Sequence, residues 1–135
     1  MFVIYVVVGL AGIVGALLRY YLGLFVGALW NGLFPLATWL ANIIGCFALG
    51  WLTAYLPRLR NLPPYVVTGL GTGLVGSFTT FSTFSVETIQ LLHTSHLELA
   101  LFYVFLSMCG GLLMAWIGFR FGQGSLRAQQ KETAK

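Results

Sequence analysis

Residues 76–85 read Gly76-Ser77-Phe78-Thr79-Thr80-Phe81-Ser82-Thr83-Phe84-Ser85, in the middle of the long apolar segment 65–92. Six of these side chains carry a hydroxyl. One Ser or Thr in an apolar helix satisfies its hydroxyl at the carbonyl four residues earlier, but that local bond explains a cluster of six less well. A Gly-Ser pair followed by two threonines is also a place where a helix can break. Broken backbone at membrane depth is tolerated only where protein buries it or it lines a cavity. The stretch therefore predicts a third helix broken near Gly76 to Thr80.

The composition of the whole chain identifies its solvent as lipid. Of the 135 residues, 59% are hydrophobic and only 7% are charged, and the mean hydropathy is +0.90. A soluble domain carries about a quarter charged residues. Three acidic and seven basic residues also provide no clustered positive surface for nucleic acid. These values exclude a soluble enzyme, a DNA-binding module and a secreted disulfide scaffold.

The apolar segments predict an all-α membrane protein with four transmembrane helices. A span needs roughly 20 apolar residues, and the sequence offers four, at about residues 2–29, 33–56, 65–92 and 97–121. The first lacks a basic leader, so we interpret it as a retained span and not as a signal peptide. Residues 1–122 form one four-helix unit, followed by a short polar tail, residues 123–135.

Subunit packing and orientation follow from the glycines and the bases. Seventeen glycines indicate close helix packing in lipid, and four helices enclose little interior, so a polar pathway would lie between subunits. Six bases share the side of the membrane that holds both chain ends, which predicts cytoplasmic termini. They are Arg58, Arg60, Arg120, Arg127, Lys131 and Lys135.

Polar groups inside the third span point to a small anion. Phe81 and Phe84 are three residues apart and share a helical face, where their electropositive ring edges can contact an anion without trapping it. Ser82 and Thr83 add hydroxyl donors beside them. Ordinary helix packing would explain the Phe pair taken alone.

A second set of neutral donors lies on the second span. Asn42 carries two N–H donors in an apolar run, and Thr38 precedes it by one turn on the same face. An interhelical hydrogen bond is an equally good explanation for Asn42 by itself. Together with the third span, these groups suit a small anion that must both enter and leave.

Three motifs, in the same order, resemble those of the CrcB/Fluc family of fluoride-specific channels. Residues 12–20 read GIVGALLRY, similar to the family's G-x-x-G-A-x-x-R-[YF]. Residues 38–50 read TWLANIIGCFALG, similar to T-x-x-x-N-x-x-G-x-F-x-x-G. Residues 76–85 with Glu87 look like G-[GS]-[FL]-[ST]-T-F-S-T-F-S-x-E, and this third motif is the most specific. The resemblance covers residues 1 to about 122.

The resemblance implies a function and an assembly. The chain would be a channel, not an enzyme, that passively exports fluoride from the cytoplasm and so lowers its toxicity. It would be a multi-pass protein of the bacterial plasma (inner) membrane. Two subunits would pack as an antiparallel, dual-topology homodimer with two fluoride pathways, around a central Na+ that is structural and not transported.

The resemblance also assigns roles to individual residues of this chain. Asn42 would contact fluoride at the base of a vestibule, and the backbone carbonyls of Gly76 and Thr79 would ligate Na+. Arg19 and Glu87 would be vestibule or structural charges. The fluoride pathway would comprise Asn42, Phe81, Phe84, Ser82, Thr83, Thr38, Tyr103 and Ser107.

Two alternatives and one conflict remain open at the level of sequence. Glu87 is the only acid within a span, about one turn from the end of the third, so the chain could be a proton-coupled small exporter, or it could be a non-transporting assembly subunit. The one-sided bases conflict with an antiparallel homodimer, which needs both orientations. A heterodimer with an oppositely oriented paralogue would resolve this conflict, although we favour the homodimer.

Overall fold

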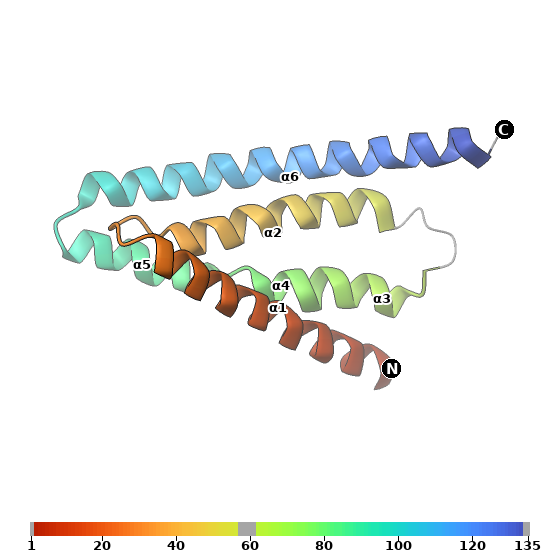
Figure 1. Cartoon of the computed structure of the whole chain (residues 1–135), viewed down its shortest axis with the longest axis horizontal. Helices are drawn as coiled ribbons and strands as arrows, with labels where there is room; N and C mark the ends of the chain where they lie inside the picture. The colour runs from red at the N-terminus through yellow and green to blue at the C-terminus, as the bar shows by residue number, and fades with distance from the viewer. Residues whose placement is uncertain (1, 57–61, 134–135) are drawn as a thin grey trace.

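The computed structural model describes residues 2–56 and 62–133, with side chains up to Gly124. All of its regular elements are helical, and Figure 1 shows both chain ends at the same end of the molecule. The bases Arg58 and Arg60 of the predicted middle connection lie outside the described residues. The elements are α1 (Phe2–Leu29), α2 (Leu36–Tyr55), α3 (Pro64–Thr68), η2 (Gly69–Val75), α4 (Gly76–Phe78), α5 (Phe81–His93) and α6 (Leu97–Thr133).

Three of the described helices, α1, α2 and α6, are long and continuous. α1, α2 and the Leu97–Gly124 part of α6 are long and apolar enough to cross a membrane. The α6 helix continues to Thr133, beyond the predicted end of the fourth span near residue 121. Residues after 121 are polar but include Gln, Arg, Ala, Lys and Glu, which favour helix in water. The change in polarity therefore marks the end of the apolar surface and not the end of the helix.

The third span is broken where the sequence predicted it. The chain runs through α3, the π-helix η2 and the short α4, and then becomes extended at Thr79 (φ −81°, ψ 161°) and Thr80 (φ −151°, ψ 124°) before α5 begins. Figure 1 shows α5 and the α3–α4 segment as separate parts of one bent rod. The prediction of four helices with an interrupted third helix is confirmed.

The α2–α6 contact, which we call the seam, brings two backbones together. A Cβ atom at Gly118 would meet the carbonyl group of Phe47, and one at Gly50 would meet the carbonyl group of Ala115. Close backbone approach of this kind replaces the hydrophobic drive that lipid does not supply. Gly23 and Gly27, by contrast, have open space around them within the described chain.

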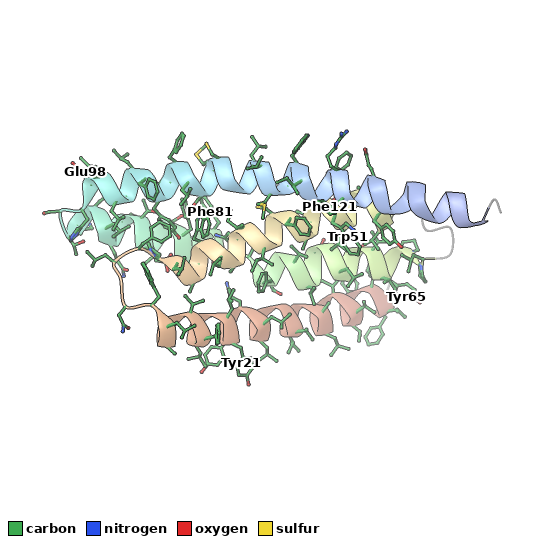
Figure 2. All side chains as sticks on the ribbon, turned by 45° about the horizontal axis from the view of Figure 1, so that its top comes forward. Tyr21, Trp51, Tyr65, Phe81, Glu98 and Phe121 are labelled. Atoms are coloured by element: carbon green, nitrogen blue, oxygen red, sulfur yellow. The ribbon has the colours of Figure 1, made fainter. Side chains whose placement is uncertain are left out.

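Apolar side chains cover the outside of the molecule. Figure 2 shows them pointing outward along α1 and α6. Phe2 is 80% exposed and Leu112 is 76% exposed, which water would not tolerate as a continuous surface. The buried cluster is small and consists of Leu91, Ala100 and Tyr103. The outer surface is therefore one for lipid or for another apolar partner.

Candidate functional site

The break is held by one side chain from α2. Asn42 donates through Nδ2 to the carbonyl oxygen of Thr80 (3.0 Å) and accepts through Oδ1 from the N–H of Thr80 (2.8 Å). Because Thr80 is extended, its own N–H and C=O point to the same side, as in a residue that exchanges both bonds with a neighbouring strand. The carboxamide of Asn42 presents an N–H donor and a C=O acceptor side by side, so it pairs with both groups of this one residue. It therefore satisfies backbone groups that the helix no longer pairs.

The hydroxyl of Thr80 begins the next helix. Its Oγ1 accepts from the N–H of Thr83 (3.2 Å) and lies 3.0 Å from Thr83 Oγ1 and 3.2 Å from Ser82 Oγ. This is an N-cap interaction, which typically stabilises a helix by about 1 kcal/mol. Thr80 was not among the residues assigned a role from the sequence, although a Thr just before an amphipathic segment is a recognised N-cap signal.

The other three hydroxyls of the cluster bond mainly within their own helix. Thr79 donates to the carbonyl of Val75 and Ser85 to that of Phe81, each four residues earlier. Ser77 Oγ lies 2.7 Å from the Gly73 carbonyl and also 2.7 Å from the Gly12 carbonyl of α1. Three of the six hydroxyls therefore bond to a carbonyl four residues earlier, as in an ordinary helix, and those of Ser82 and Thr83 lie against the hydroxyl of Thr80.

A cavity of about 380 Å³ opens beside the break. It brings together six residues that the sequence predicted for the site. The Oγ of Ser107 is buried and has no hydrogen-bond partner among the described residues. Because an unpaired buried hydroxyl is costly, and because Ser107 is one of the lining residues, this hydroxyl is a candidate donor for a ligand. The six residues are Asn42, Gly76, Thr79, Phe81, Phe84 and Ser107.

Three aromatic rings run from the surface into the protein. The ring centroids of Phe81 and Phe84 are 5.9 Å apart, and those of Phe84 and Tyr103 are 5.0 Å apart. Phe81, labelled in Figure 2, is 80% exposed, whereas Tyr103 is fully buried. Neither pair of rings is stacked in parallel, since the angle between the ring planes is 37° for Phe81 and Phe84 and 50° for Phe84 and Tyr103. The predicted sharing of one face by Phe81 and Phe84 is confirmed.

Glu87 receives a hydroxyl donor at each carboxylate oxygen. Thr38 Oγ1 donates to Oε1 (2.7 Å), and Tyr103 OH donates to Oε2 (2.9 Å). An acid in an apolar span needs such partners, since an unpaired buried charge is very costly. Thr38 and Tyr103 therefore form a group with Glu87 outside the cavity lining, and the Tyr103 ring connects that group to Phe84.

Three predicted residues lie outside both groups. Ser82 and Thr83 are exposed and do not line the cavity, although both contact the Thr80 hydroxyl. Arg19 is half-exposed on α1, which packs mainly against η2 and α4, and it does not line the cavity either.

Comparison with known sequences assigns this chain to a family. Residues 6–119 match the family described as CrcB-like protein, camphor resistance (CrcB). The chain belongs to the CrcB family. A Bacillus cereus CrcB relative, named fluoride-specific ion channel FluC 1, is 58% identical over 119 residues, which is 88% of this chain and 83% of the relative. Relatives with the same name are 53% identical in Bacillus thuringiensis subsp. konkukian, over 96% of this chain and 94% of the relative, and 45% identical in Moorella thermoacetica, over 85% and 82%.

The CrcB match includes the entire candidate site. The matched range 6–119 contains the break, the residue that holds it (Asn42), the carboxylate of Glu87 and the unpaired hydroxyl of Ser107. The chain is therefore a multi-pass membrane protein whose polar interior belongs to the family region and not to the polar tail.

Proposed function

We propose that this chain is the subunit of a fluoride-specific channel that lets fluoride leave the cytoplasm passively. The observation that carries the proposal is the cavity at the break, lined by neutral donors and aromatic rings in a chain of the CrcB family. Relatives more than 50% identical to it are named fluoride-specific ion channels. A channel passes its ion without covalent chemistry, so the protein is not an enzyme.

The lining of the cavity suits a small anion in transit. Ser107 offers an unpaired hydroxyl, and the Nδ2 atom of Asn42 carries a second N–H beyond the one that donates to the Thr80 carbonyl. Phe81 and Phe84 add ring edges, which carry partial positive charge. None of these groups is a full cation, so the anion can be held weakly enough to leave. Ser82, Thr83, Thr38 and Tyr103 complete the proposed pathway.

An antiparallel dimer would complete the site. Phe81 is 80% exposed and Gly76 is also exposed, although both line the cavity. A second copy packed over the broken span would close the cavity and bury these residues. The one-sided bases favour a single orientation, so the partner is either a flipped copy of this chain or an oppositely oriented paralogue.

A structural Na+ between the two broken spans would fit the oxygen atoms at the break. Hard cations prefer carbonyl and carboxylate oxygens, and the carbonyls of Gly76 and Thr79 lie where the helix has lost its regular pairing. The N–H of Thr80 would donate to the Gly76 carbonyl in an unbroken helix, but it donates to Asn42. Two such carbonyls from each of two subunits would hold the ion, which stays in place and is not transported.

Fluoride efflux from liposomes tests the proposal. Purified full-length chain is reconstituted, a fluoride gradient is imposed, and valinomycin with K+ clamps the voltage. We expect fast, electrogenic efflux without a pH gradient, and no efflux when chloride replaces fluoride. Efflux that appears only with an imposed proton gradient would replace the channel by a coupled exporter.

Two substitutions locate the pathway within that assay. Phe81→Ile removes the exposed ring and Asn42→Asp places an anion beside the cavity, so we expect both to abolish fluoride flux. Phe25→Ile is the matched control, since Phe25 is 65% exposed on α1 and does not line the cavity. Flux that survives in both pathway variants would remove this cavity from the proposal.

A further inference from the structure

The peptide that joins Thr79 to Thr80 is oriented by Asn42. The described chain contains no cis peptide bond, so the N–H of Thr80 and the C=O of Thr79 point in opposite directions across one planar unit. The N–H points to Asn42 Oδ1, at 2.8 Å. The carbonyl of Thr79 must therefore point away from the Asn42 side chain, toward the side that α2 leaves free.

The same hydrogen bond leaves the carbonyl of Gly76 without its helical donor. In a continuous α-helix that carbonyl would accept from the N–H four residues later, which belongs to Thr80. Asn42 takes this N–H instead. Both effects come from one side-chain oxygen. The second bond, from Nδ2 to the Thr80 carbonyl at 3.0 Å, holds the following peptide, so Asn42 bonds to the peptides on both sides of Thr80.

We infer that Asn42 is a positioning residue for the cation site, so that its loss weakens Na+ binding independently of any contact with the anion. The inference rests on the Na+ part of the proposed function, since the two affected carbonyls, of Gly76 and Thr79, are the proposed ligands. Asn42 also lines the cavity beside Phe81. One residue would thus connect the cation that holds the two subunits together with the path of the anion.

The chemistry of the carboxamide makes a prediction for each replacement. Aspartate keeps an oxygen acceptor for the Thr80 N–H but lacks the N–H donor for the Thr80 carbonyl. Alanine keeps neither. Because groups that orient the ligands of a metal typically change its affinity about 10- to 100-fold when removed, alanine should weaken Na+ binding strongly and aspartate much less.

The test measures Na+ binding through stability and not through transport. The full-length chain in detergent is titrated with NaCl, with N-methyl-D-glucamine chloride keeping the ionic strength constant. The thermal midpoint and the fraction of cross-linked dimer are followed. A ligand that binds only the folded assembly raises its stability as its concentration passes the dissociation constant. Lithium and potassium salts show whether the effect is specific to Na+.

We expect Asn42→Ala to raise the Na+ concentration at half of the stabilising effect, the Na+ midpoint, by about tenfold or more. Asn42→Asp should raise the Na+ midpoint much less, although its fluoride flux is lost. Thr53→Val is the matched control on the same helix. The exposed Thr53 hydroxyl bonds to the carbonyl of Leu49 in its own helix, and Thr53 does not line the cavity. The Na+ concentration at half of the effect should therefore stay at the wild-type value in this variant.

Several results would overturn the inference. An unchanged Na+ midpoint in Asn42→Ala, with flux lost, would mean that Asn42 acts on the anion alone. If the alanine variant does not fold, a tenfold rise in Asn42→Asp overturns the inference as well, because that variant keeps the acceptor. If wild-type protein conducts fluoride but Na+ changes neither its thermal midpoint nor its fraction of cross-linked dimer, the cation site and this inference are both wrong. The proposal of a channel would still stand.

Discussion

The α2–α6 seam and the break in the third span pair their backbone N–H and C=O groups in opposite ways. Along the seam, each backbone polar group is paired within its own helix, and glycines such as Gly50 and Gly118 let the two helices touch. At the break, the backbone of Thr80 is paired by a side chain from another helix. Lipid provides no water to pair these groups, so the irregular segment depends on the regular one.

This dependence has a direction, because the two helices of the seam supply the side chains that bond to Thr80 and Glu87 of the broken span. Asn42 and Thr38 come from α2, and Tyr103 comes from α6. The helices of the seam must be in register with each other before these side chains can reach Thr80 and Glu87. Damage to the seam should therefore remove fold and function together, and damage at the break should remove function with a smaller effect on the fold.

The largest effect is expected from Gly118→Leu. A Cβ atom at this position meets the backbone of Phe47 and Trp51, which cannot move aside as a side chain can. The two helices must separate, at a cost of about 3 kcal/mol or more, the upper end of what overpacking costs. Unfolding in detergent measures it. Gly23→Leu, with open space around it, should leave the unfolding midpoint of the subunit unchanged, and an equal loss in both variants would contradict the seam.

The sequence predicted the local features of this molecule better than its long-range pairs. The break near Gly76 to Thr80 could be predicted because glycine and neighbouring hydroxyl side chains act on the backbone over a few residues. The partner of Asn42 could not, since Thr80 lies 38 residues away and only packing sets which faces of two helices meet. The two hydroxyl donors to Glu87 were missed for the same reason, although an acid in an apolar span always requires partners.

The next largest effect is expected from Tyr103→Phe. This change removes the donor to Glu87 Oε2 and keeps the ring that contacts Phe84. A buried acceptor left without its partner costs about 1–3 kcal/mol, so the unfolding midpoint should fall by less than in Gly118→Leu.

Glu87→Gln provides the comparison for that variant. A neutral amide keeps one oxygen acceptor and cannot carry a proton through the membrane. In a channel, fluoride efflux without a pH gradient continues in this variant. Loss of a proton-driven component, measured with and without an imposed pH gradient, would instead support the coupled exporter.

A smaller effect is expected from Thr80→Ala. The variant loses the N-cap bond to the Thr83 N–H but keeps the backbone bonds to Asn42. We expect a loss of about 1 kcal/mol, measured by unfolding in detergent, and Thr80→Ser should restore it. Thr88→Ala is the control, since the Thr88 hydroxyl bonds only to the carbonyl of Phe84 in its own helix. An equal loss in the control would show that the hydroxyl of Thr80 is not special.

The smallest effect on stability, and the sharpest separation of fold from function, is expected from Ser107→Ala. The Ser107 hydroxyl is buried without a partner among the described residues, so its removal breaks no hydrogen bond within the subunit and should change stability by less than about 0.5 kcal/mol. A hydrogen bond to an ion contributes about 1.5–3 kcal/mol, so fluoride flux should fall about tenfold or more. Ser85→Ala, whose hydroxyl bonds to its own helix, should keep its flux. Full flux in Ser107→Ala would mean that the anion passes without this donor, and the pathway would then lie along the ring edges of Phe81 and Phe84 alone.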